Sequence, residues 1–358
     1  MSRKNARLAA LRARIREVDS AGAADAAAAG AVVVDVRSAD EVAGGRVPGA
    51  HHVDRGWLEL RIEQVAPDLD APIILYCGFG QRSLFAAADL LDLGYTNVTS
   101  LAGGFDAWKA EGRPVEVPRA LDAEARARYA RHLNLPEVGE AGQLKLLDAR
   151  VLIVGAGGLG SPAALYLAAA GVGTLGIVDH DVVDRGNLQR QVLHGDDRVG
   201  QPKVDSARQT LAALNPGVRL ETHAERVGPD NVEALVGAYD VVVDGTDNFA
   251  ARYAINDACV RAGVPNVHGA VHRFEGQAGV FWPAGPQGGP CYRCAFPAPP
   301  PPELAPSCAE AGVLGSMCGF IGTLQAVETT KLIVGAGDTL HGRLLSVDAM
   351  RMQVRELR

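Results

Sequence analysis

A stretch of ten residues, Val151 to Gly160, constrains the fold of this chain more than any other. It begins with four apolar residues, three of them β-branched, which is typical of a buried parallel strand. Gly155, Gly157 and Gly160 then fit the spacing G-x-G-x-x-G, and an alanine-rich helix is expected over 163–170. A strand, a glycine turn and a helix together predict an α/β fold with an anion-binding turn. The turn alone suits a nicotinamide, a flavin or an ATP site.

Polar residues after the following strands favour ATP. Asp179 closes an apolar strand at a distance from the turn that suits a ribose-binding acid, which a dehydrogenase would also have. The chain then presents an amide, two cations and a further strand-end carboxylate: Asn187, Arg190, Lys203 and Asp247. Cations neutralise charge at phosphorus and a carboxylate holds Mg²⁺, whereas hydride transfer needs neither. Each residue alone also fits a surface charge or a helix cap.

A second candidate site lies near the N-terminus. Cys77 ends the apolar strand expected over 72–77, and the loop after it contains two glycines and Arg82 before a helix expected over 84–93. Backbone N–H groups, the helix dipole and an arginine all lower the pKa of a thiol in such a place. The alternative is a buried structural cysteine.

Residues 20–117 resemble the rhodanese (sulfurtransferase) family. The matching segments are Val34 to Arg37 with Glu41, Gly45 to Ala50, Cys77 to Ser83, and Leu101 to Trp108 with Gly112 and Pro114. The resemblance implies that Cys77 carries a persulfide, and the six-residue loop from Cys77 to Arg82 matches the members that handle sulfur. Arg46 stands where the family usually has histidine.

Residues 121–358 resemble the MoeB/ThiF family, whose members adenylate ubiquitin-like sulfur carriers. The matching motifs are Arg128 to Arg131, Gly155 to Gly160, Asp179, Asn187 to Gln191, Gly200 to Lys203, Thr246 to Asn248, Glu275 to Gln277 and Pro290 to Cys294. The implied fold is a rhodanese domain over 1–118, with a parallel sheet flanked by helices, and a Rossmann-like adenylation domain over 119–358. Relatives with both domains more often have them in the reverse order.

The resemblance also implies a role for each site residue. Asp179 binds the ribose, Asn187, Arg190 and Lys203 contact phosphates, and Asp247 holds Mg²⁺. Arg131 matches an arginine that reaches the γ-phosphate from the other subunit of a homodimer. The remaining nucleotide-binding positions are Gly155, Gly157, Gly158, Gly160, Gln191 and Asn248. In the implied reaction the C-terminal glycine carboxylate of the carrier attacks the α-phosphate of ATP.

The later cysteines divide into a pair and two single residues. Cys291 and Cys294 have metal-ligand spacing, but two thiolates supply half of the family's four-cysteine zinc site. Free thiols are therefore favoured over zinc, with zinc shared with another chain as the alternative. Cys308 occupies the position of a thiol that bonds to the carrier in several relatives, and we expect it to take part in sulfur handover. Cys318 is expected to be structural.

The predicted product is a thiocarboxylate on a ubiquitin-like carrier ending in Gly-Gly. The small subunit of molybdopterin synthase is the expected carrier, with thiamine-pathway and tRNA-thiolation carriers as alternatives. The expected sulfur source is a persulfide donor such as a cysteine desulfurase. Two other hypotheses for the function are a nicotinamide oxidoreductase and a non-catalytic docking scaffold.

The composition of the chain limits the kinds of partner that it can bind and the cellular compartment that we expect for it. The net charge of −7 argues against nucleic acid as a partner. We expect no membrane segment and a cytoplasmic protein with reduced cysteines.

Overall fold

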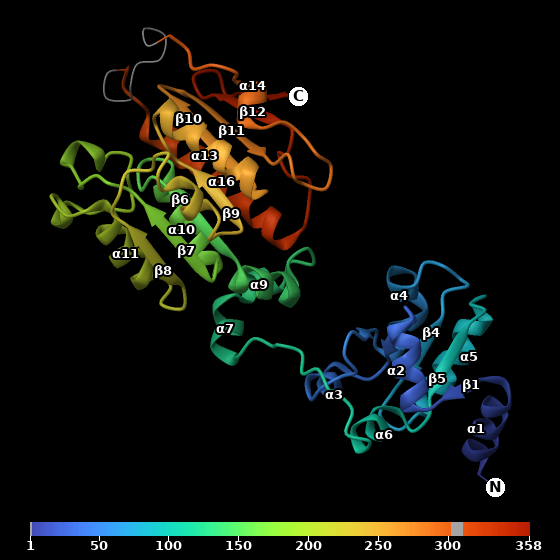
Figure 1. The fold of residues 1–358 in the computed structure, drawn as a ribbon. Helices are drawn as coiled ribbons and strands as arrows, with labels where there is room; N and C mark the ends of the chain where they lie inside the picture. Colours follow the sequence, from blue (N-terminus) through green and yellow to red (C-terminus); the bar gives the residue numbers. More distant parts are fainter. Residues whose placement is uncertain (1, 302–310) are drawn as a thin grey trace. The chain divides into compact units, whose positions relative to one another are not determined.

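The structure, a computed structural model, describes residues 2–301 and 311–358. Internal contacts divide the chain into two compact units, Met1–Ala120 and Leu121–Arg358. Each unit is an α/β fold with its own sheet (Figure 1). Among the described residues, no helix is both long and apolar enough to cross a membrane.

Unit 1 is built on a five-stranded parallel sheet in the order β1-β5-β4-β2-β3. Its strands are β1 (Arg16–Val18), β2 (Val32–Asp35), β3 (His51–His52), β4 (Ile73–Tyr76) and β5 (Val98–Leu101). Its helices are α1 (Arg3–Arg14), α2 (Ser20–Ala28), α3 (Ala39–Ala43), the 3-10 helix η1 (Arg55–Trp57), α4 (Leu58–Val65), α5 (Arg82–Asp92) and α6 (Gly104–Ala110).

Successive side chains along the strands of unit 1 point to opposite faces of the sheet, and different helices cover the two faces. Ile73 and Leu75 pack with α1, α4 and α5, whereas Ile74 and Tyr76 pack with α2 and α6. The sheet is therefore buried on both faces, as a parallel sheet requires. Leu8 and Leu11 of α1 are buried against this core.

Unit 2 contains an eight-stranded sheet in the order β13-β12-β11-β10-β9-β6-β7-β8. Its strands are β6 (Arg150–Val154), β7 (Thr174–Val178), β8 (Arg219–His223), β9 (Val241–Asp244), β10 (Asn266–His272), β11 (Glu275–Phe281), β12 (Leu344–Asp348) and β13 (Gln353–Leu357). The neighbouring strands β8, β7, β6, β9 and β10 pair in parallel. The strands β10, β11, β12 and β13 pair antiparallel. The helices of unit 2 are α7 (Ala123–Arg128), α8 (Ala130–Leu133), α9 (Gly139–Asp148), α10 (Gly160–Ala170), η2 (Arg185–Asn187), η3 (Asp196–Arg198), α11 (Lys203–Leu214), α12 (Val232–Val236), α13 (Phe249–Ala262), α14 (Tyr292–Ala295) and α16 (Gly315–Val334).

Helices cover both faces of the parallel half of this sheet. Val151 and Ile153 of β6 pack in one core with α9, α10, α11 and α16, while Leu152 and Val154 pack in another with α12 and α13. The central strand β6 lies between β7 and β9, so the glycine turn that follows it opens at the carboxyl edge of the sheet. Ligands of doubly wound sheets bind at this edge.

Candidate functional site

The glycine turn after β6 is held by close backbone packing. Gly155 has φ +95°, which favours glycine, and a Cβ on Gly160 would lie 1.8 Å from the carbonyl oxygen of Gly155. Asp179, at the end of β7, accepts the backbone N–H of Ala156 at 2.9 Å and that of Asp181 at 2.8 Å. The predicted ribose acid therefore also ties the turn to the neighbouring strand.

A cavity of about 780 Å³ opens in front of this turn. Of the predicted nucleotide residues, the cavity is lined by Gly155, Gly157, Gly158, Asp179, Arg190, Gln191, Lys203, Asp247 and Asn248. Residues that lie up to 93 positions apart in the sequence, from Gly155 to Asn248, thus line one cavity. The volume is within the range that protein sites use for cofactors and drug-sized ligands.

Lys203 is the buried cation of this cavity. It is the first residue of α11, and its ammonium contacts the Asp181 carboxylate at 3.0 Å. Burial opposes ionisation of Asp181, but the hydrogen bond and the charge of Lys203 outweigh it and hold the pKa of Asp181 below its ordinary value. The second cation, Arg190, donates from Nη1 to the carbonyl oxygen of Gly186 at 3.3 Å.

The loop after β9 supplies a carboxylate that is available for a metal. Asn248 caps α13 by accepting the N–H of Ala251 at 2.9 Å. The exposed side chain of Asp247 has no hydrogen bond within residues 2–301 and 311–358. A carboxylate that lines the cavity and is engaged by no other described group fits a Mg²⁺ ligand. The carboxylates of Asp179 and Asp181 lie close together but already accept backbone N–H groups or the Lys203 ammonium.

In unit 1, Cys77 lies between β4 and α5 and is buried. Its backbone carbonyl accepts the N–H of Phe105 at 2.8 Å, and its Sγ lies 3.7 Å from the hydroxyl of Ser83. A Cβ on Gly104 would lie 2.2 Å from the Cys77 carbonyl oxygen, so the loop needs glycine there. The thiol is thus held between a loop and the first turn of a helix, as predicted.

Arg82 is engaged by a carboxylate that sequence reasoning did not pair with it. Its Nη1 and Nη2 donate to the two carboxylate oxygens of Glu41, at 2.8 Å and 2.5 Å. The hydrogen bond from Arg82 lowers the pKa of Glu41 to about 2. Glu41 and the thiol of Cys77 both raise the pKa of Arg82 above its ordinary value, Glu41 by more. The Arg82 cation is therefore already paired with a carboxylate.

The cysteine pair of unit 2 lies at the start of α14, with the Cys291 and Cys294 sulfurs 3.6 Å apart. Partial burial raises the pKa of Cys291, but hydrogen bonds from Cys294 and Arg293 outweigh it, so the net shift is downward. No third cysteine, histidine or acid of the described residues lies close enough to complete a metal cluster with this pair. The pair therefore does not fit a four-ligand zinc site by itself. Cys308 lies outside the described residues.

Comparison with known protein families accounts for nearly all of the chain. Residues 129–358, more than half of the sequence, match the ThiF family. The chain belongs to the ThiF family. Residues 20–111 match the rhodanese-like domain. We therefore refer to unit 2 as the ThiF unit and to unit 1 as the rhodanese-like unit.

Two curated relatives of the chain carry names that describe an activity. "Probable adenylyltransferase/sulfurtransferase MoeZ" of Mycobacterium tuberculosis (strain CDC 1551 / Oshkosh) is 54% identical over 244 residues, which are 68% of this chain and 62% of that protein. "SAMP-activating enzyme E1" of Haloferax volcanii is 53% identical over 233 residues, 65% of this chain and 85% of that protein. The chain thus spans under two thirds of the length of the MoeZ relative.

A solved structure supports the fold alone. E. coli MccB with ATP is 22% identical, with a TM-score of 0.57 over 66% of this chain and 73% of that chain. The expected Rossmann-like fold of the ThiF unit is therefore confirmed.

Not every predicted residue of the ThiF unit lines the cavity. Gly160 is the first residue of α10, Asn187 ends η2, and Arg131 is an exposed residue of α8 with no ion pair among the described residues. Conversely, Arg252 and His268 line the cavity and were missed. Arg252 stands four residues after the helix cap Asn248, a spacing that places it one turn along α13 and could have signalled it.

Proposed function

We propose that this protein adenylates the C-terminal glycine of a ubiquitin-like sulfur carrier and converts it to a thiocarboxylate with sulfur from Cys77. One observation carries the proposal. A cavity lined by the glycine turn, Asp179, Lys203 and Asp247 occurs on the same chain as a rhodanese-like unit with its cysteine loop intact. Tethering a sulfur donor to an adenylase raises its effective concentration at the activated carboxylate.

The chain's own groups would bind ATP along the cavity. The Asp179 carboxylate would accept a hydrogen bond from a ribose hydroxyl, while the glycine turn, Arg190 and Lys203 would bind the phosphates. The carboxylate oxygen of the carrier forms a bond to the α-phosphorus, and the bond to the β-phosphate oxygen breaks, releasing pyrophosphate. Both reactants are anions, so the cations lower the repulsion that opposes their approach. Asp247 would hold Mg²⁺, which supplies charge neutralisation at the phosphates.

Sulfur transfer would use the rhodanese-like unit. The terminal sulfur of a Cys77 persulfide attacks the carbonyl of the acyl-adenylate, and AMP leaves. The resulting acyl–S–S–Cys77 link is cleaved by a thiol reductant, which gives the thiocarboxylate and a disulfide. Arg82 would stabilise the persulfide anion, and Cys308 is proposed to take part in the handover on the family resemblance alone.

The partners form part of the proposal. The carrier is the small subunit of molybdopterin synthase, with thiamine-pathway and tRNA-thiolation carriers as alternatives, and the persulfide comes from a donor such as a cysteine desulfurase. The name of the Haloferax relative, "SAMP-activating enzyme E1", supports an activating role for this chain. A homodimer is proposed because Arg131 does not line the cavity of its own chain.

The test is carrier-dependent exchange of labelled pyrophosphate into ATP, with a panel of ubiquitin-like proteins ending in Gly-Gly. Exchange with one carrier is the expected result and identifies the pathway. ATP binding without exchange for any carrier would favour the docking scaffold. NAD binding that survives K203A would favour the oxidoreductase.

The sulfur half is tested in the same full-length protein. C77A is expected to abolish thiocarboxylate formation from a persulfide donor, scored by mass spectrometry of the carrier, and to leave pyrophosphate exchange unchanged. Undiminished thiocarboxylate in C77A would show that sulfur reaches the carrier by another route.

A further inference from the structure

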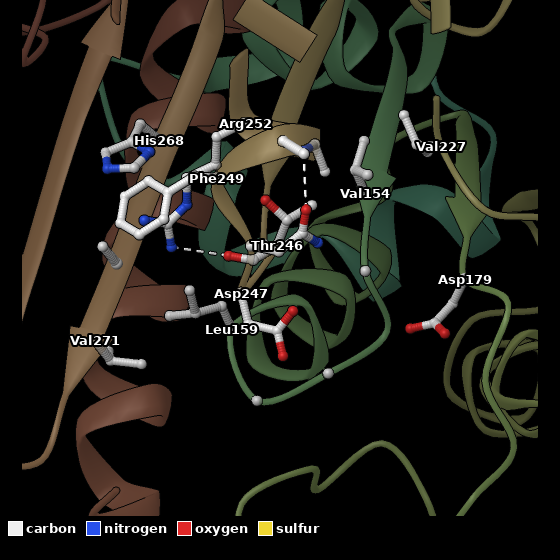
Figure 2. A pocket seen from close by; sticks show the side chains of 18 of the residues that line it. Val154, Leu159, Asp179, Val227, Thr246, Asp247, Phe249, Arg252, His268 and Val271 are labelled. Carbon is white, nitrogen blue, oxygen red and sulfur yellow. Dashed lines mark hydrogen bonds between the residues drawn. The ribbon is translucent and has the colours of Figure 1, made fainter. Parts of the chain in front are cut away.

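The cavity of the ThiF unit extends beyond the nucleotide residues. Asp179 and Val227 lie toward one end, and Phe249, Val271 and His268 lie toward the other (Figure 2). Asp247 lies between the two groups in this view. The second end is largely aromatic and aliphatic, with Arg252 as its cation.

Arg252 is unusual among the arginines of α13. Its Nη2 donates to the Thr246 carbonyl oxygen at 2.9 Å and its guanidinium lies 5.5 Å from the centre of the Phe249 ring. Its Nε is buried and has no hydrogen-bond partner among the described residues. By contrast, Arg261 on the same helix is paired with Glu233 at 2.7 Å.

The neighbouring acid does not satisfy Arg252. Asp244 is buried and accepts the N–H of Thr246 at 3.0 Å and its hydroxyl at 2.6 Å, with His268 at 3.5 Å. Burial opposes ionisation of Asp244, but the hydrogen bond with His268 and the charge of Arg252 outweigh it and lower the pKa of Asp244. Arg252 forms no ion pair with Asp244 or with any other described carboxylate. A cation beside apolar walls with an unused donor is costly unless a ligand supplies the acceptor.

We propose that Arg252 binds the terminal carboxylate of the carrier and presents it to the α-phosphate. This inference rests on the proposed function and adds a substrate-binding residue to it. One carboxylate oxygen accepts from the guanidinium while the other forms the bond to phosphorus, as pyrophosphate leaves. The oxygen held by Arg252 becomes the carbonyl oxygen of the acyl-adenylate, so the same contact polarises the carbon that sulfur attacks.

Three full-length variants test the assignment: R252A, R252K and the matched control R261A. R252A is expected to raise the KM for the carrier in pyrophosphate exchange by about 10- to 100-fold, the usual effect of losing a charge-assisted hydrogen bond. The affinity for ATP–Mg²⁺ without carrier is expected to stay within about twofold, since the nucleotide groups lie elsewhere in the cavity. R252K, which keeps a charge and one donor, recovers part of the loss, and R261A matches the wild type.

Two results would overturn the inference while leaving the proposed function intact. One is an R252A protein whose carrier KM and kcat are unchanged. The other is a parallel loss of ATP–Mg²⁺ affinity, which would mean that Arg252 acts only by holding Thr246 beside Asp247. Should R252A lower the melting temperature, R252K carries the test by the same split between carrier KM and ATP affinity. Failure of the wild type to exchange with any carrier would instead overturn the proposed function.

Discussion

Replacing Lys203 is expected to change the activity of the protein much more than its stability. The ammonium of Lys203 is buried, but its partner Asp181 is half-exposed, so water can solvate that carboxylate once the lysine is gone. We expect K203A to fold with a free energy of unfolding within about 1 kcal/mol of the wild type. Loss of a charge-assisted contact to phosphate should lower kcat/KM for ATP in pyrophosphate exchange by about 10- to 100-fold. R208A, at an exposed position of the same helix, serves as the control and should retain wild-type exchange.

Glu41 provides a pH-dependent prediction at the same scale. Arg82 lowers its pKa from 4.5 to about 2. A depressed carboxyl pKa means that the pair contributes stability above pH 4.5, and that this contribution is lost as the pH falls towards 2. Carbon NMR titration of the glutamate carboxylates should find Glu41 with a midpoint near 2, and R82A should raise that midpoint, while the remaining Ser38 hydrogen bonds still lower the pKa of Glu41. An unshifted midpoint in the wild type would show that the pair does not form in solution.

The sequence allowed us to predict which residues line a ligand site, but not which side chains pair with one another. Lys203, Asp179 and Asp247 were expected at one edge of the sheet because parallel strands bring their carboxyl ends together. The Arg82–Glu41 pair joins α3 to α5 across 41 positions, and no local spacing encodes it. Arg252 was missed because an arginine inside a helix is ordinarily a solvated charge. Only the cavity around it indicates otherwise.

At the scale of elements, two glycines of the turn after β6 have different roles: one is needed for backbone packing and the other lines the cavity. Alanine at Gly160 would place its Cβ 1.8 Å from the Gly155 carbonyl oxygen, whereas alanine at Gly157 would meet nothing nearer than Gln191 Nε2 at 3.8 Å. We expect G160A to be destabilised by about 1–3 kcal/mol or more, because backbone must move. G157A should melt like the wild type but bind ATP more weakly, since Gly157 lines the cavity. Calorimetry on the two proteins distinguishes these effects, and equal melting temperatures would contradict the packing argument.

Secondary structure was predictable where strands were short and apolar. The strand and glycine turn expected over 151–160 are β6 and the start of α10, and Lys203 is the first residue of α11. The small and apolar residues over 312–334 predict a helix there, and α16 begins three residues later, at Gly315. The antiparallel extension of the sheet by β11, β12 and β13 was not predicted.

At the scale of the whole molecule, the proposed homodimer makes the two active sites interdependent. R131A removes the arginine that a subunit would lend to its partner, and D247N removes the metal ligand of a subunit's own site. Mixed dimers would contain one site with both groups intact. Co-refolded equimolar R131A and D247N should therefore regain roughly a quarter of wild-type exchange, although each alone is inactive. Recovery would not occur if Arg131 served its own subunit.

The ion pair between Lys203 and Asp181 has a consequence for turnover. Under the proposed function, the ammonium leaves Asp181 when a phosphate arrives and returns to it when the product departs, so Asp181 acts as a resident substitute for phosphate. The buried cation always has an anion beside it, and the site never has to desolvate a lone charge. Affinity for ATP then reflects the difference between two ion pairs rather than the strength of one. A competing internal anion of this kind weakens binding and in return lets pyrophosphate and AMP dissociate.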